Sequence, residues 1–201
     1  MKAMKCLRRH GIECNFNESK ISSLRLGLRF SFLQILSMRF SLQLYFLMTN
    51  EDINFMKQAL ELAQKGEGFA TPNPMVGALI VRDGQIVGEG FHVFERIKHA
   101  EVLALEMAGE LAKGATLYCS LEPCCHHGRT PPCTDAMIEA GITRAVVAIV
   151  DPDSRVSGSG IQQLKDAGIE VIVGICEAEA YNLNIEYFSA KGKTQSMVSV
   201  D

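Results

Sequence analysis

Residues 121–133 read LEPCCHHGRTPPC, and residues 99–101, further upstream, read HAE. The longer string follows an apolar run, residues 115–121, that is typical of a buried strand. It ends where a helix is predicted over residues 132–140. The shorter string opens another predicted helix, residues 99–113, which Gly114 ends. Polar and thiol side chains are therefore expected at the end of one strand and at the starts of two helices.

The rest of the chain continues this alternation of helix and strand. Asp83-Gly84 is a hairpin turn between two apolar runs, and Gly141 and Gly168 follow predicted helices. Periodicity predicts further helices over residues 53–66, 160–167 and 177–189, and further strands over residues 75–81, 85–90, 144–150 and 169–173. The predicted fold class is α/β, a three-layer α-β-α arrangement around a mixed sheet of about five strands.

The two strings contain the residue types of a zinc site. His-x-Glu, followed by Pro-Cys and a second Cys, resembles the zinc nucleobase deaminases. Zinc takes nitrogen and thiolate ligands in a tetrahedron, so three protein ligands leave one position for water. We expect His99, Cys124 and Cys133 to bind Zn²⁺ and Glu101 to transfer protons without binding the metal. Cys125 remains open as a substitute ligand, although the resemblance favours Cys124, directly after proline.

Composition and charge indicate a soluble globular protein, and they are compatible with a small anionic substrate. The 201 residues are 47% hydrophobic and 21% charged. Residues 1–48 contain eight Lys or Arg and two Glu, a net charge of +6, whereas residues 49–201 contain twelve Lys or Arg and twenty-one Asp or Glu, a net charge of −9. An acidic domain lacks the basic surface that duplex DNA or long RNA requires. We therefore expect no nucleic-acid partner.

The first 48 residues differ in character from the rest. The apolar segment 21–47 is interrupted by Arg25, Arg29 and Arg39, and its uncharged runs are shorter than the roughly 20 residues of a membrane span. We expect residues 1–48 to be an extension that is disordered or not native, with Met48 as the start; a transit peptide is the weaker alternative. The domain is expected over residues 49–191, followed by a tail, residues 192–201.

The distribution of the cysteine residues bears on the cellular compartment of the protein. Four of the seven Cys residues lie within residues 119–133, a clustering that favours metal binding or catalysis under reducing conditions over a disulfide framework. No convincing secretory signal precedes them. We expect a cytoplasmic protein without a membrane partner.

Three strings together resemble one family. Besides LEPCCHHGRTPPC, they are TPNPMVG at residues 71–77 and GEGFH at residues 88–92. All three are similar to the deaminase half of the bacterial riboflavin-biosynthesis deaminase–reductases, and the resemblance runs from about residue 50 to about residue 191. Eight residues separate Cys124 from Cys133, whereas the generic deaminase motif has two. This insertion makes the resemblance more specific than the metal motif alone.

The resemblance implies a cytidine deaminase-like fold and a reaction. Water would replace the 2-amino group of 2,5-diamino-6-ribosylamino-4(3H)-pyrimidinone 5′-phosphate, and ammonia would leave. It also implies that Asn73, His126, Arg129 and Thr130 contact this substrate, and Arg129 suits the phosphate by charge and by its planar fork of donors. Asp151, at the end of a predicted strand, is a weaker candidate beside the site.

Other interpretations remain open. The chain contains no Gly-rich dinucleotide loop and ends at Asp201, so we expect the family's reductase domain to be absent. The alternatives are another nucleotide deaminase, a tRNA-adenosine deaminase, or a non-catalytic zinc-binding subunit that pairs with an active partner. The resemblance also implies a homo-oligomer.

Overall fold

The structure, a computed structural model, describes residues 50–191. The extension predicted over residues 1–48 and the tail predicted over residues 192–201 lie outside the described residues. Within the described part, none of the helices combines the length and the apolar character that crossing a membrane requires.

A five-stranded mixed sheet forms the centre of the fold. Its strands are β1 (Gly77–Arg82), β2 (Gln85–Phe91), β3 (Thr116–Cys119), β4 (Arg144–Val147) and β5 (Glu170–Val173), in the order β2-β1-β3-β4-β5. β1 is antiparallel to both of its neighbours, whereas β3, β4 and β5 are parallel. Four strands, all except β1, therefore point the same way, and their carboxyl ends lie at one edge of the sheet.

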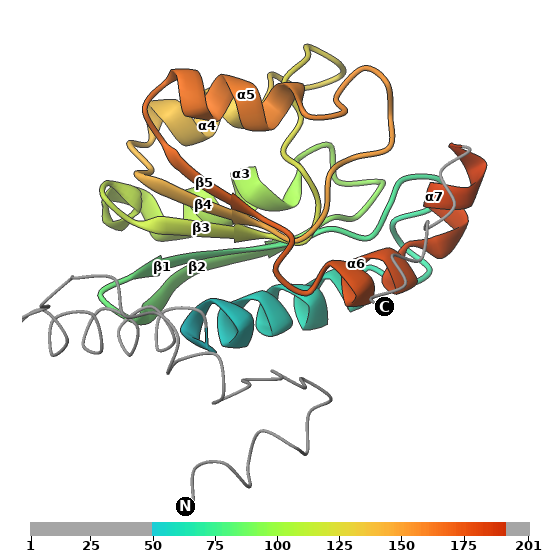
Figure 1. Cartoon of the computed structure of the whole chain (residues 1–201), viewed down its shortest axis with the longest axis horizontal. Helices are drawn as coiled ribbons and strands as arrows, with labels where there is room; N and C mark the ends of the chain where they lie inside the picture. Colours follow the sequence, from blue (N-terminus) through green and yellow to red (C-terminus); the bar gives the residue numbers. More distant parts are fainter. Residues whose placement is uncertain (1–49, 192–201) are drawn as a thin grey trace, which may run out of the picture. The chain divides into compact units, whose positions relative to one another are not determined.

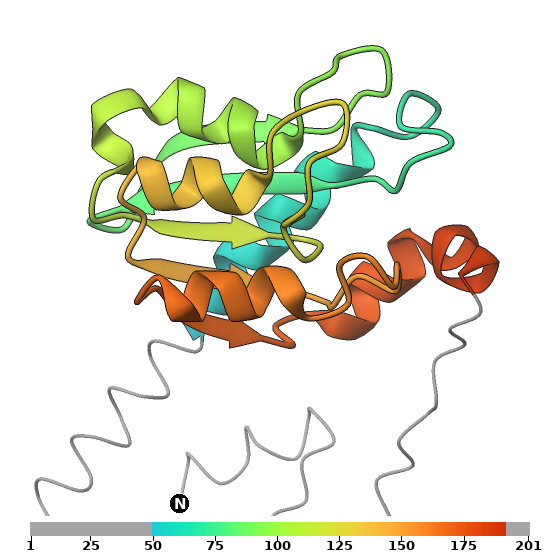
Figure 2. The ribbon, with the colours of Figure 1, turned by 90° about the horizontal axis from the view of Figure 1, so that it is seen from above.

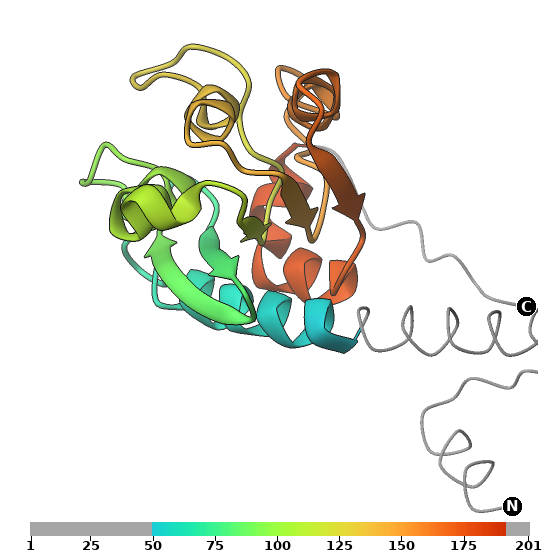
Figure 3. The same ribbon diagram turned by 90° about the vertical axis from the view of Figure 1, so that its left-hand side faces the viewer.

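Helices cover both faces of this sheet, which confirms the predicted three-layer α/β fold (Figures 1 and 3). One face packs against α3 (Ala100–Ala108), α4 (Cys133–Glu139) and α5 (Ser159–Asp166), which Figure 2 shows lying next to one another. The other face packs against a helix over residues 50–64 and against α6 (Glu177–Leu183) and α7 (Ile185–Ala190).

Period-two alternation along the strands produces two separate cores. On β1, Ile80 faces the α3 side and Leu79 faces the other side; on β3, Leu117 and Tyr118 divide in the same way. All four side chains are at most 3% exposed. A sheet buried on both faces explains why its strands read as nearly continuous apolar runs.

Two predicted helices are interrupted. The helix predicted over residues 99–113 is α3 followed by a short 3₁₀ helix, Gly109–Ala112, and Gly109 adopts a φ of 53°. The helix predicted over residues 177–189 divides into α6 and α7 at Asn184. The Asn184 amide donates to the Met75 carbonyl and accepts from the Met75 N–H, both at 2.8 Å. These bonds join α7 to the segment before β1, a long-range contact that local periodicity does not report.

A buried ion pair joins the first helix to the sheet. Arg144 donates to both carboxylate oxygens of Asp52, at 2.8 and 2.7 Å, and the Tyr118 hydroxyl donates to the same carboxylate at 2.8 Å. Burial and the hydrogen bond to Asp52 raise the pKa of Tyr118 well above its usual value. The group lies on the face of the sheet that packs against the helix of residues 50–64.

A second buried carboxylate, Glu122, organises the loop between β4 and α5. It accepts backbone N–H bonds from four residues at 2.9–3.2 Å: Asp151, Gly158, Gly160 and Ile161. The last two lie in the first turn of α5, where the free N–H groups favour a negative charge. A Cβ on Gly160 would lie 2.1 Å from the Pro123 carbonyl oxygen, so the start of α5 packs directly against Pro123, the residue before Cys124 in the segment that follows β3.

Replacing Glu122 by Gln should destabilise the fold. A Gln amide removes the charge and presents an N–H₂ group to N–H donors, so at least one buried backbone donor loses its partner. We expect a loss of about 2–4 kcal/mol in the free energy of unfolding, because hydrogen bonds to charged groups contribute roughly 1.5–3 kcal/mol. Urea unfolding measures it. Glu139→Gln, on an exposed position of α4, is the matched control, and equal midpoints for both variants would contradict the role of Glu122.

Candidate metal centre and active site

Three residues from three different segments converge at the edge where the parallel strands end. His99 immediately precedes α3, Cys124 lies in the loop after β3, and Cys133 is the first residue of α4. His99 Nδ1 lies 3.1 Å from Cys133 Sγ and 3.5 Å from Cys124 Sγ, and the two sulfur atoms are 3.5 Å apart. Among residues 50–191 this is the group whose ligand atoms could hold a metal ion, and Cys125 is not part of it.

The donor set and its spacing fit zinc. Zn–N and Zn–S bonds of about 2.0–2.3 Å in a tetrahedron separate ligand atoms by roughly 3.5–3.8 Å. The three observed separations, 3.1, 3.5 and 3.5 Å, lie within a few tenths of an ångström of that range. One nitrogen and two sulfur donors are a borderline-soft set that suits zinc better than calcium or magnesium.

The environment of Cys124 favours its thiolate. Hydrogen bonding from the Cys133 thiol, together with His99, lowers the pKa of Cys124 to about 4. The Cys133 backbone N–H also donates to Cys124 Sγ, at 3.4 Å. The same shared hydrogen bond raises the pKa of Cys133. One of the two sulfurs is therefore prepared to bind a cation at neutral pH.

Glu101 lies in the first turn of α3, beside this group. Its side chain is buried, with the residue 4% exposed, and it nevertheless lines the adjoining cavity. Burial, and next the charge of Cys124, raise the pKa of the Glu101 carboxyl. A raised pKa makes the carboxyl hold a proton more readily, which suits a group that accepts a proton and returns it.

A cavity of about 340 Å³ opens beside the three candidate ligands, and His99 and Cys124 line it. All four substrate contacts predicted from the resemblance also line it: Asn73, His126, Arg129 and Thr130. Nδ1 of His126 is buried without a hydrogen-bond partner among the described residues. Such an atom is costly unless a ligand or water pairs with it.

The cavity also has polar residues that sequence reasoning did not single out. His92 holds Asn73, whose Nδ2 lies 3.0 Å from His92 Nε2, and burial lowers the pKa of His92, which favours the neutral ring as acceptor. His92 belongs to the GEGFH string, so the family resemblance of that string was the signal that could have identified His92 as a site residue. Four further polar residues line the cavity without a comparable local signal: Arg96, Asp153, Arg155 and Tyr187.

Comparison with known proteins identifies close relatives of this chain. It is 58% identical over 138 residues to the riboflavin biosynthesis protein RibD of Aquifex aeolicus, a match that covers 69% of this chain and 39% of the relative. Among solved structures, RibD of Acinetobacter baumannii (form 2) superposes with a TM-score of 0.71 at 50% identity, over 73% of this chain and 41% of that one. The relatives named here are longer than this chain, which spans about two fifths of their length.

A third relative is described by its activities. A Thermotoga maritima protein described as a diaminohydroxyphosphoribosylaminopyrimidine deaminase/5-amino-6-(5-phosphoribosylamino)uracil reductase superposes with a TM-score of 0.69 at 45% identity, over 72% of this chain and 42% of that one. The family model of the cytidine and deoxycytidylate deaminase zinc-binding region matches residues 49–149, which is half of the 201-residue chain. This chain belongs to the family that shares the cytidine and deoxycytidylate deaminase zinc-binding region.

Proposed function

We propose that this chain catalyses the zinc-dependent hydrolytic deamination of 2,5-diamino-6-ribosylamino-4(3H)-pyrimidinone 5′-phosphate, a step of riboflavin biosynthesis. The observation that supports this most is the group of His99, Cys124 and Cys133 beside a cavity lined by the HHGRTPP loop. The relatives with the highest identity described above are riboflavin biosynthesis proteins. The domain responsible is proposed to span residues 49–191.

In this proposal His99, Cys124 and Cys133 are the metal ligands. Zinc held there supplies Lewis-acid activation of water near neutral pH. Glu101 accepts, on a carboxylate oxygen, the proton that the attacking water gives up. It delivers that proton to the ring nitrogen. It then accepts the second proton, from the hydroxyl group that now stands on the ring carbon, and delivers it to the departing amine. The C=O bond forms as the C–N bond breaks, and ammonia leaves.

The remaining groups bind and orient the substrate. Asn73, held by His92, has an amide that can hydrogen-bond the pyrimidine, and His126 Nδ1 gains a partner when substrate fills the cavity. Arg129 lines the cavity from the loop between the two cysteines and has no ion pair among the described residues. An unpaired guanidinium suits a bidentate contact with the 5′-phosphate, and the neighbouring Thr130 can donate its hydroxyl.

We also propose a substrate class, a cellular compartment and an oligomeric state for the protein. The net charge of −9 over residues 49–201 supports a small-molecule substrate over a nucleic acid. The cysteine cluster supports a reducing compartment such as the cytoplasm. A homo-oligomer is proposed from the family resemblance, and sedimentation of the purified chain measures the oligomeric state.

Ammonia release from a panel of substrates tests the function. We expect turnover of the diaminopyrimidine ribosyl phosphate and little turnover of deoxycytidylate, cytidine or a tRNA anticodon stem-loop. The panel is assayed by coupled ammonia detection, with zinc quantified in the same preparation. Activity on deoxycytidylate without activity on the diaminopyrimidine phosphate would overturn the proposal, and zinc binding without any turnover would favour a non-catalytic subunit.

Replacing Glu101 by Gln should separate chemistry from metal binding. The variant keeps the size and burial of the side chain but cannot exchange a proton, so we expect kcat to fall about 10²–10⁴-fold, the usual contribution of a general acid–base. Zinc content and substrate affinity should be nearly unchanged. Glu110→Gln, at an exposed position in the 3₁₀ helix, is the control. Normal turnover by Glu101→Gln would remove Glu101 from the mechanism.

Serine replacements of the adjacent cysteines test the ligand assignment. Cys124→Ser removes a soft donor from the three-residue group and should lose zinc, whereas Cys125→Ser should retain it because Cys125 lies outside that group. Metal analysis after dialysis against a weak chelator measures both variants under the same conditions. The opposite result would assign the ligand to Cys125.

A further inference from the structure

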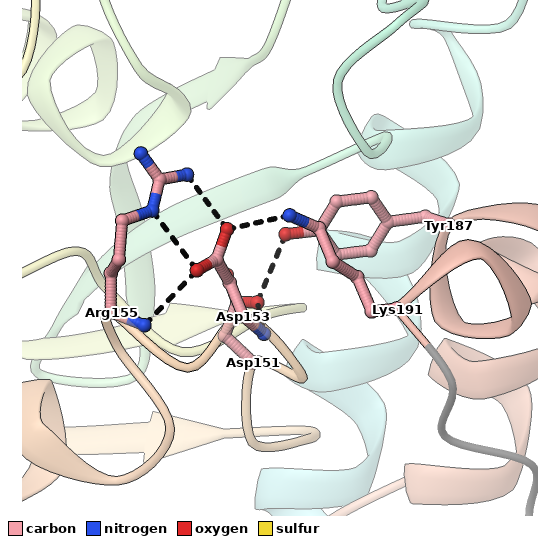
Figure 4. Close-up of polar contacts among 5 residues, drawn as sticks. All are labelled: Asp151, Asp153, Arg155, Tyr187 and Lys191. Atoms are coloured by element: carbon pink, nitrogen blue, oxygen red, sulfur yellow. Dashed lines mark hydrogen bonds and ion pairs between the residues drawn. The ribbon is translucent and has the colours of Figure 1, made fainter.

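One wall of the cavity combines the loop after β4 with the last described helix, α7. The loop contributes Asp151, Asp153 and Arg155 to the cavity lining, and α7 contributes Tyr187 (Figure 4). Neither carboxylate ligates in the three-residue metal group. The deamination mechanism leaves these groups unused, although both Asp residues are at most 8% exposed.

Asp151 is held from two sides. Its Oδ1 accepts the Asp153 backbone N–H at 2.8 Å and the Tyr187 hydroxyl at 3.0 Å. The first bond is local to the loop, whereas the second joins residues 36 positions apart. Tyr187 is thus a side-chain link from α7 to the carboxylate that begins the loop.

Asp153 is held by two cations. Arg155 donates through Nε at 3.0 Å and through Nη2 at 2.7 Å, its backbone N–H donates at 3.0 Å, and Lys191 Nζ approaches the same carboxylate at 2.8 Å. These bonds, above all the hydrogen bond from the Arg155 side chain, lower the pKa of the Asp153 carboxyl well below its usual range. Lys191 Nζ also lies 5.8 Å from the centre of the Tyr187 ring.

The charges of this wall balance only when Lys191 is included. Asp151 and Asp153 bring two negative charges, and Arg155 and Lys191 bring two positive charges. Without Lys191, this wall of the cavity would have a net negative charge. That charge would repel a phosphorylated substrate, because charges interact more strongly in a site of reduced dielectric. Lys191 does not line the cavity itself, so it acts through Asp153.

We propose that Tyr187 and Lys191 are positioning residues for substrate binding, which hold Asp151 and Asp153 in place and keep this wall of the cavity electrically neutral. The inference rests on the proposed function, because it takes the cavity as the site of an anionic substrate. Lys191 does not line the cavity, and the Tyr187 hydroxyl donates to Asp151, so we expect each residue to affect binding and not the chemical step.

The test compares Tyr187→Phe and Lys191→Gln with the unaltered full chain. We expect KM for the diaminopyrimidine ribosyl phosphate to rise about twofold to tenfold, the range of one hydrogen bond or partly buried ion pair, with kcat changed less than about twofold. Lys191→Arg should restore the KM. Lys165→Gln, on an exposed position of α5, and Tyr118→Phe, which removes a Tyr–Asp hydrogen bond outside the cavity, are the matched controls.

Hydrogen exchange supplies a readout independent of turnover. The backbone N–H groups of Asp153 and Arg155 are bonded to the two carboxylates, so their exchange should accelerate in both variants but not in Lys165→Gln. Unchanged exchange, or faster exchange with an unchanged KM, would overturn the inference while leaving the proposed function intact. An unaltered chain that releases no ammonia would instead overturn the proposed function, and the inference with it.

Discussion

The direction of the strands is the constraint on which the site depends. Because β1 is antiparallel to both β2 and β3, β2 runs parallel to β3, β4 and β5, and four carboxyl ends meet at one edge. The segments that follow them bring His99 after β2, Cys124 after β3 and Asp151 after β4 to the same place. Ligands of open α/β sheets bind at such edges for this reason.

Buried carboxylates complete the architecture of this edge. Glu122 satisfies four backbone N–H groups of the loop between β4 and α5, and it directly precedes Pro123 and Cys124 in the metal motif. The loop that Glu122 holds also contains the carboxylates that face α7. The loop is therefore joined by hydrogen bonds to Glu122, which lies two residues before Cys124 in the chain, and through Asp151 to Tyr187 of α7. Hydrogen bonds to charged groups are the stronger class in proteins.

Sequence reasoning recovered most of the framework. The spacing of apolar residues and the positions of turn residues predicted the five strands and the helices on both faces. Strands were recognisable because a sheet buried on both faces needs apolar side chains pointing to each face in turn. Sequence reasoning failed where a long-range contact overrides local periodicity. Asn184 divides one predicted helix because its amide pairs with the backbone of Met75, 109 residues away in sequence.

The sequence by itself determined the chemistry available: one imidazole, two thiols and a carboxyl in a fixed order, with an eight-residue loop between the cysteines. Local patterns could indicate this chemistry because His99, Glu101 and Cys133 stand at helix starts and Cys124 follows a buried strand, where sequence signals are strong. Only the tertiary structure decided which groups surround the cavity, including His92 beside Asn73 and Tyr187 beside Asp151. Both pairs join segments that are far apart along the chain. The Tyr187–Asp151 pair forms because α7 packs against the sheet, and no local sequence pattern encodes that packing.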